Sequence, residues 1–241
     1  MTTKSSMETL NLDDLTNPVL TDTQRQILDY TEAREVTFDI DEMMAEAVHQ
    51  AGADDLADDD GFADHLAAHV AAIESDTGLR QLIRSSLRAR VIRKVRNRLS
   101  LTDLLKRYPE IEAIPIERPL IVVGMPRSGT THLVNLIAED PRRRALPYWE
   151  AEDPIPALGQ GPDVFGVDPP RYTRVKAEHE ALMATTPYVA AMHDRFPPEA
   201  IEEEVELLDL DMAGYVLEWH ARSRAGGTTT SASTTSATTP T

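Results

Sequence analysis

The residues of this chain whose types and spacing could do chemistry lie in one short turn, residues 124–131, with the sequence Gly-Met-Pro-Arg-Ser-Gly-Thr-Thr. The four apolar residues 120–123 precede the turn and predict a buried strand, and residues 132–140 have the pattern of a helix. In a strand–turn–helix unit, successive backbone N–H groups converge on one point and the helix N-terminus adds partial positive charge. We therefore expect this turn to bind an anion.

The spacing within the turn separates it from the phosphate loop of nucleoside triphosphatases. Gly124 and Gly129 have the spacing of the pattern GxxxxGK[ST], but Thr130 stands where that pattern has Lys. Those enzymes need the Lys to contact the transferred phosphate, so hydrolysis of ATP or GTP is not expected. The cation lies inside the turn as Arg127, whose guanidinium can bind a tetrahedral anion through two parallel hydrogen bonds. The alternative is a structural corner shaped only by Gly and Pro.

The segments after the turn predict further strands and helices. Residues 146–150, Leu-Pro-Tyr-Trp-Glu, predict a second strand that ends at Glu150, and residues 171–185 and 198–221 predict helices. Alternation of strands and helices favours an α/β fold, a P-loop-type parallel sheet with flanking helices. Ligands bind at the carboxyl ends of the strands in such a sheet, which is where Glu150 is expected.

The chain before the turn has the pattern of a mostly α-helical region. An acidic connector, residues 54–60, interrupts it but lacks the ligand spacing of a calcium loop. His65 and His69 lie four residues apart on one helix face without an evident third ligand, so we expect no metal site. Apolar residues recur at helical spacing in four segments, residues 23–30, 39–50, 62–78 and 79–105.

The last of these segments is strongly basic outside its apolar stripe. One interpretation is a surface for a polyanion. Because no aromatic side chains interleave to stack on bases, we favour a charged helix face that offsets the acidic segment before it. The basic residues are Arg80, Arg84, Arg88, Arg90, Arg93, Lys94, Arg96 and Arg98.

Composition limits the classes of partner. The 241 residues carry a formal net charge of −17, which disfavours nonspecific binding to nucleic acid or to anionic membranes. There is no cysteine, so disulfides and thiolate metal sites are excluded. No apolar run approaches the length of a membrane span, and no apolar signal region follows Met1. We expect a cytoplasmic protein with neither nucleic-acid nor membrane partners.

Residues 122–131, Val-Val-Gly-Met-Pro-Arg-Ser-Gly-Thr-Thr, resemble the 5′-phosphosulfate loop of sulfotransferases that use 3′-phosphoadenylyl sulfate (PAPS). The similarity is to the bacterial branch with Pro-Arg-Ser-Gly-Thr-Thr, which shares its loop style with tyrosylprotein sulfotransferases. It extends more loosely over residues 79–222, including residues 146–150 and 202–204. The resemblance implies sulfuryl transfer from PAPS to a hydroxyl or amine of a small-molecule acceptor, without a metal. Donor binding would involve Pro126, Arg127, Ser128, Gly129, Thr130 and Thr131, with Arg127 also catalytic.

The resemblance also suggests a catalytic base. Glu150 lies 19 residues after Thr131, near the position at which tyrosylprotein sulfotransferases place a Glu base. The other interpretation of Glu150 is a structural partner of an arginine. Sulfotransferases of the cytosolic type have Lys in place of Arg127 and use a His base, for which His132, His193 and His220 are the alternatives.

The predicted organisation has three parts: a helical region over residues 1–116, a partial P-loop sulfotransferase domain over 117–224, and a low-complexity tail over 225–241 that is expected to be disordered. The later strands and 3′-phosphate site that the resemblance implies cannot be located, so the chain looks C-terminally truncated. Residues 226–241 carry no charge, as in a natural flexible tail or a shifted reading frame.

Two other functions stay open at this point. A nucleotide kinase or another P-loop phosphoryl transferase would bind ATP with magnesium. A non-catalytic helical interaction module, residues 23–115, could carry a relict phosphate loop. The acceptor, the oligomeric state and the activity of the truncated chain are not readable from the sequence.

Overall fold

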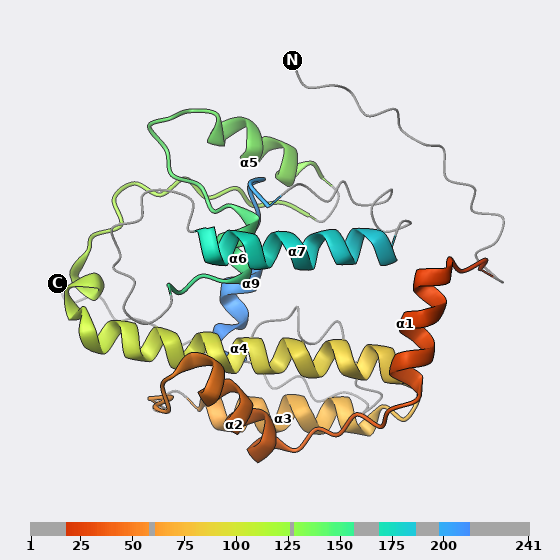
Figure 1. The fold of residues 1–241 in the computed structure, drawn as a ribbon. Helices are drawn as coiled ribbons and strands as arrows, with labels where there is room; N and C mark the ends of the chain where they lie inside the picture. Colours follow the sequence, from red (N-terminus) through yellow and green to blue (C-terminus); the bar gives the residue numbers. More distant parts are fainter. Residues whose placement is uncertain (1–17, 58–60, 126–127, 157–168, 187–197, 213–241) are drawn as a thin grey trace.

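The computed structural model describes residues 18–57, 61–125, 128–156, 169–186 and 198–212 (Figure 1). Within these ranges the regular structure is helical, apart from one isolated β-bridge between Pro147 and Ile201. None of the described helices is long and apolar enough to cross a membrane. The helices are α1 (Asp22–Glu32), α2 (Ile40–Ala51), α3 (Phe62–Ser75), α4 (Gln81–Arg107), α5 (Thr130–Ala138), α6 (Tyr148–Glu152), α7 (Pro169–Thr185) and α9 (Val205–Leu208), with 3₁₀ turns η1 (Pro109–Ala113) and η2 (Asp209–Asp211).

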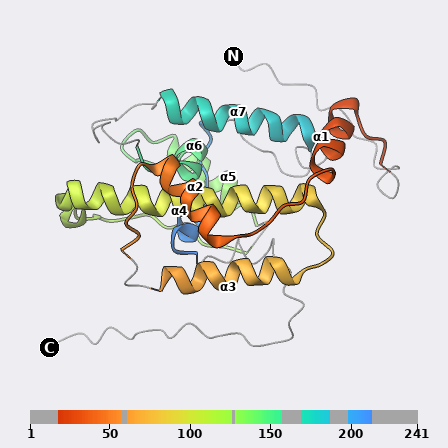
Figure 2. The same ribbon diagram turned by 60° about the horizontal axis from the view of Figure 1, so that its bottom comes forward.

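Helix α4 is the axis of the molecule. It has 27 residues and lies between α7 on one side and α3 on the other in both views (Figures 1 and 2). Leu87, Val91, Val95 and Leu99 recur every four residues along it, so they form one buried stripe. Helices α2 and α3 cover this stripe with Met43, Ala47, Phe62, Leu66 and Ile73.

The helices of the N-terminal region form where the sequence predicts them. Asp39 caps α2 by accepting a hydrogen bond from the Glu42 N–H at 3.0 Å, and Gly52 ends it with a left-handed φ of 68°. Helix α1 starts at Asp22, one residue before the predicted segment, and Thr21 caps it by accepting a hydrogen bond from the Gln24 N–H. Each helix satisfies its own backbone hydrogen bonds, so these predictions needed no pairing with another segment.

The strand predicted at residues 120–123 is absent from the described structure. The segment has no ladder hydrogen bonds, and Ile121 and Val123 are 70% and 86% exposed. A strand is stable only beside another strand, and among the described residues no segment pairs with this one. The predicted parallel sheet is therefore not confirmed.

The strand predicted to end at Glu150 is wrong, because residues 148–152 form helix α6. Pro147 precedes α6 in an extended conformation and makes the isolated antiparallel bridge to Ile201. The N–H groups of Tyr148 and Trp149 donate to the carbonyl oxygens of Ala200 and Pro198 at 2.8 and 3.0 Å. Proline has no N–H to give to a ladder, which limits this segment to one bridge.

The helix predicted over residues 198–221 is also partly wrong. Residues 198–204 use their backbone to contact residues 146–149, so helical structure starts only at α9 and continues through η2 (Asp209–Asp211). The remaining residues of that prediction, 213–221, lie outside the described ranges, as does the predicted tail, 225–241. Helices α5 and α7 agree with their predictions.

Candidate functional site

The turn that begins at Gly124 folds back tightly on itself. A Cβ atom on Gly124 would lie 2.8 Å from both Ser128 Oγ and Thr130 Cγ2, so a side chain at this position would require both of these side chains to move. The Ser128 N–H and hydroxyl both donate to the Met125 carbonyl oxygen, at 3.1 and 2.6 Å. Gly129 then has a φ of 95°, which a side chain would strain, and leads into α5. Pro126 and Arg127 lie outside the described residues.

The start of α5 is suited to an anion. The first intrahelical bond runs from the Leu133 N–H to the Gly129 carbonyl at 3.0 Å, so the N–H groups before Leu133 have no acceptor within the helix. Gly129 occupies the N-cap position and has no side chain to cap them. Ser128 is exposed, and Thr130 and Thr131 are half-buried. This combination of free amides, hydroxyls and helix dipole can bind a phosphate or sulfate group.

Glu150 lies in the first turn of α6, at 19% side-chain exposure. Its Oε1 accepts a hydrogen bond from Arg144 Nη2 at 2.6 Å. The arginine pair that the sequence offered as the alternative role is therefore present. Of the histidine alternatives, His132 is an exposed residue of α5, and His193 and His220 lie outside the described ranges.

One segment, residues 198–203, contacts both α5 and α6. Its backbone pairs with residues 146–149 beside α6, including a bond from the Glu202 N–H to the Leu146 carbonyl at 2.9 Å. On its other side, Ile201 contacts the Asn135 side chain of α5, and Glu203 Oε1 lies 3.5 Å from Thr131 Oγ1. Sequence reasoning missed Asn135. Its only signal is an amide four residues after Thr131, where it reaches the same helix face.

Most of the basic side chains of α4 pair with carboxylates, whereas Arg98 donates to the carbonyl oxygens of Leu56 and Ala57, so these contacts favour a charged structural face. The carboxylates come from α1, α2, α3, α6, α7 and α9, not only from the acidic segment before α4. Arg80 pairs with Glu32, Arg84 with Glu74, Arg88 with Glu42 and Glu46, Arg90 and Lys94 with Glu206, Arg93 with Glu152 and Glu178, and Arg96 with Asp153.

The most buried of these pairs joins α4 to α9. Lys94, only 1% exposed, places Nζ 2.8 Å from Glu206 Oε2 and 2.7 Å from the Glu206 carbonyl oxygen. Burial alone would raise the pKa of Glu206, but Lys94 and Arg90 outweigh it and lower that pKa to about 2. Burial lowers the pKa of Lys94 and raises that of Asp209, which lies 3.4 Å from Arg90. These shifts reflect structural ion pairs.

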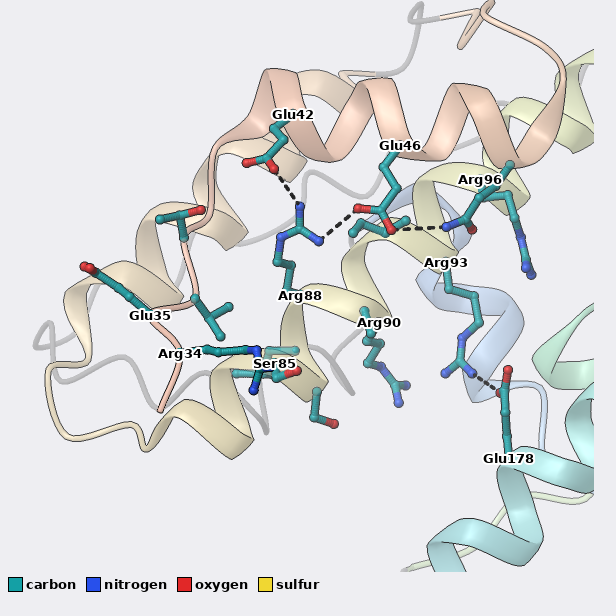
Figure 3. A pocket seen from close by; sticks show the side chains of 17 residues that line it. Arg34, Glu35, Glu42, Glu46, Ser85, Arg88, Arg90, Arg93, Arg96 and Glu178 are labelled. Carbon is teal, nitrogen blue, oxygen red and sulfur yellow. Dashed lines mark hydrogen bonds and ion pairs between the residues drawn. The ribbon is translucent and has the colours of Figure 1, made fainter. Parts of the chain in front are cut away.

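A cavity of about 800 Å³ lies between α2, α4 and α7 (Figure 3). Arginines dominate the α4 wall, but carboxylates from the other helices already neutralise them. Arg88 lies 2.9 Å from Glu46 and Arg93 lies 3.3 Å from Glu178. The residues lining the cavity come from residues 34–50, 85–96 and 178, not from the turn. We therefore place the candidate site at the turn and α5.

The two histidines of α3 were the candidates for a metal site. His65 Nδ1 lies 3.2 Å from the Asp211 carbonyl oxygen, and His69 is buried in α3. Within the described ranges, no group of three His, Cys, Asp or Glu side chains could hold a metal ion.

Comparison with solved structures gives two sulfotransferases. Sulfotransferase STF1 from Mycobacterium tuberculosis H37Rv is 29% identical with a TM-score of 0.65, over 79% of this chain and 51% of that one. Sulfotransferase STF9 from Mycobacterium avium is 25% identical with a TM-score of 0.60, over 76% of this chain and 47% of that one. The chain thus spans about half the length of the sulfotransferases it matches.

Comparisons at the level of sequence give one match, to a family model. A comparison with curated protein sequences gave no significant match. A family model described as the sulfotransferase family matches residues 119–236, a range that contains the whole turn, α5 and Glu150. With the turn geometry and the two structural neighbours, this match establishes that the chain belongs to the sulfotransferase family.

Proposed function

We propose that this chain carries the donor-binding part of a sulfotransferase that moves a sulfuryl group from PAPS to a hydroxyl or amine of a small-molecule acceptor in the cytoplasm. The observation that carries the proposal is the turn itself. Gly124 lies close to the side chains of Ser128 and Thr130, Gly129 is left-handed, and α5 begins without a capping side chain. Thr130, in place of the lysine of the pattern GxxxxGK[ST], favours a sulfate donor over a nucleoside triphosphate.

The turn residues fit the anionic part of PAPS. The uncapped N–H groups of α5 and the hydroxyls of Ser128, Thr130 and Thr131 would hold its 5′-phosphosulfate. Arg127 and Pro126 complete this set by resemblance, with Arg127 supplying the positive charge that neutralises the leaving phosphate. When bound, PAPS supplies an activated sulfuryl group.

The reaction forms one bond and breaks another. The acceptor oxygen or nitrogen forms a bond to sulfur while the bond between sulfur and the 5′-phosphate oxygen breaks, which leaves adenosine 3′,5′-bisphosphate. The acceptor's proton passes to a carboxylate, for which we propose Glu150. The protein contributes mainly position and charge neutralisation, as in phosphoryl transfer.

The Arg144 pair does not exclude Glu150 from this role. The Arg144 side chain is 65% exposed, and an ion pair with an exposed partner contributes only about 0–1 kcal/mol. An acceptor hydroxyl could therefore replace the guanidinium beside Glu150 at small cost.

The proposal is tested by calorimetric binding of adenosine 3′,5′-bisphosphate to the full chain. We expect saturable binding that Arg127→Ala weakens by about 100-fold, because a bidentate charged contact is lost. Arg142→Ala is the matched control, since Arg142 is 87% exposed and pairs with Asp140. Equal binding by Arg127→Ala would remove Arg127 from the site. Tighter binding of ATP with magnesium than of the bisphosphate would favour a phosphoryl transferase.

A further inference from the structure

Asn135 makes three polar contacts that join α5 to a segment from the other end of the described chain. Its Nδ2 donates to the Thr131 carbonyl oxygen at 2.8 Å and to the Ile201 carbonyl oxygen at 3.3 Å. Its Oδ1 accepts from the Ile201 N–H at 3.3 Å. An amide side chain offers both donors and an acceptor, so Asn135 pairs with the backbone of Ile201 as a neighbouring strand would.

Ile201 is held from its other side as well. It forms the antiparallel bridge with Pro147, directly before α6, and its neighbours Ala200 and Glu202 bond to Tyr148 and Leu146. The backbone of Ile201 therefore lies between Asn135 of α5 and the residue that precedes α6. Through this one residue, the helix that starts with Thr130 and Thr131 is linked to the helix that carries Glu150.

The same segment is anchored to the rigid part of the molecule. Five residues after Ile201, Glu206 is held by Lys94 and Arg90 of α4 at 2.8 and 2.7 Å. Figure 1 shows the blue segment that contains α9 running from α5 to α4. The contacts thus continue from α4 through Glu206 and Ile201 to Asn135 and then to Thr131.

We infer that Asn135 is a positioning residue, which sets the start of α5 relative to α6 by pairing with the backbone of Ile201. The inference rests on the proposed function, because the position of α5 matters to the reaction only if its first turn holds the donor. Displacements of about 1 Å at a binding turn can cost about 100-fold in rate, so a fixed helix start has a clear use.

Three variants test this role. Asn135→Leu keeps the approximate size but removes all three contacts. Asn135→Asp keeps the acceptor for the Ile201 N–H and loses both donated bonds. Glu139→Gln is the control, because Glu139 is an exposed residue at the end of the same helix. Two measurements are made on the full chain: binding of adenosine 3′,5′-bisphosphate by calorimetry, and hydrogen exchange of the amides of α4 and α5.

We expect the dissociation constant to rise about tenfold in Asn135→Leu and less in Asn135→Asp, with no change in Glu139→Gln. Amide exchange in α5 should rise about tenfold in Asn135→Leu, whereas exchange in α4 should stay as in the wild type. Faster exchange in α4 as well would mean that Asn135 supports the whole fold, and would overturn a specific positioning role.

The two proposals fail in different ways. Normal binding and unchanged α5 exchange in Asn135→Leu would overturn the inference and leave the proposed function intact. A wild-type chain that does not bind the bisphosphate would count against the proposed function. In that case the exchange of the α5 amides still decides whether Asn135 fixes this helix.

Discussion

The region around α4 and the region of the turn differ sharply in how their apolar residues are used. Leu99 and Val91 of α4 are 0% and 1% exposed, whereas Ile121 and Val123 before the turn are 70% and 86% exposed. Both segments are rich in branched apolar residues. A helix satisfies its own backbone and needs only one face covered, but a strand needs a neighbour for its backbone as well. Local sequence is therefore enough for the first region and not for the second.

Most of the exposed large apolar side chains lie in residues 114–136, before and within α5. Glu206 links α4 to the segment that contacts α5 through Ile201. These exposed apolar residues lie on and before α5. The large apolar residues concerned are Ile114, Ile116, Leu120, Ile121, Val123, Met125, Leu133 and Leu136.

The largest expected effect contrasts one leucine from each region. Leu99→Ala should lower the free energy of unfolding by about 3 kcal/mol, because it leaves a cavity in the core. Leu120→Ala, at a residue that is 56% exposed, should change it by less than about 0.5 kcal/mol. Urea unfolding followed by circular dichroism measures both. Equal losses of unfolding free energy in the two variants would show that residues 119–125 are buried in solution. The contrast between the two regions would then be wrong.

The next effect concerns the ion pair that joins the two regions. Glu206→Gln should destabilise the fold by about 3 kcal/mol, because it leaves the ammonium of Lys94 buried without its carboxylate. Glu204→Gln removes an exposed carboxylate two residues earlier and should stay within about 0.5 kcal/mol of the wild type. The same unfolding experiment compares them. If the two variants were equally stable, α9 would not be anchored to α4 by charge.

The smallest effect is the pH dependence of that pair. The pKa of Glu206 is lowered from its ordinary value of 4.5 to about 2, so the stabilisation by its ion pairs is present above pH 4.5 and is lost as the pH falls toward 2. Between pH 5 and pH 3, Glu206 becomes protonated in the unfolded chain but stays ionised in the folded chain. The stability difference between wild type and Glu206→Gln should therefore narrow by about 2 kcal/mol over that range. A difference that stayed constant would show that folding does not shift the pKa of Glu206.

Much of the helical fold was predictable. The periodic apolar residues of α2, α3 and α4 indicated both the helices and their buried faces, and Asp39 and Gly52 indicated where α2 begins and ends. The errors concern residues 146–150 and 198–204, which contact each other from positions about 50 residues apart. A short aromatic run contains too few residues for hydrophobic periodicity to distinguish a strand from one turn of helix.

The candidate site divides in the same way. The glycines, hydroxyls and helix start of the turn were readable because their roles depend on local backbone geometry. The Arg144 partner of Glu150 and the Ile201 contact of Asn135 were not, since neither residue belongs to a motif. Arg127, which the resemblance makes central, lies outside the described residues, so its role stays a prediction.

The amino-acid sequence alone determined the tight turn at residues 124–131, the sulfotransferase family and the helices that precede the turn. These features depend on residues close to one another in the chain, where glycine conformation, capping and helical period act directly. Tertiary structure alone decided that α4 pairs its charges with six other helices and that Ile201 joins α5 to α6. Contacts between distant segments depend on which segments the fold brings together in space, and the local sequence pattern does not specify this.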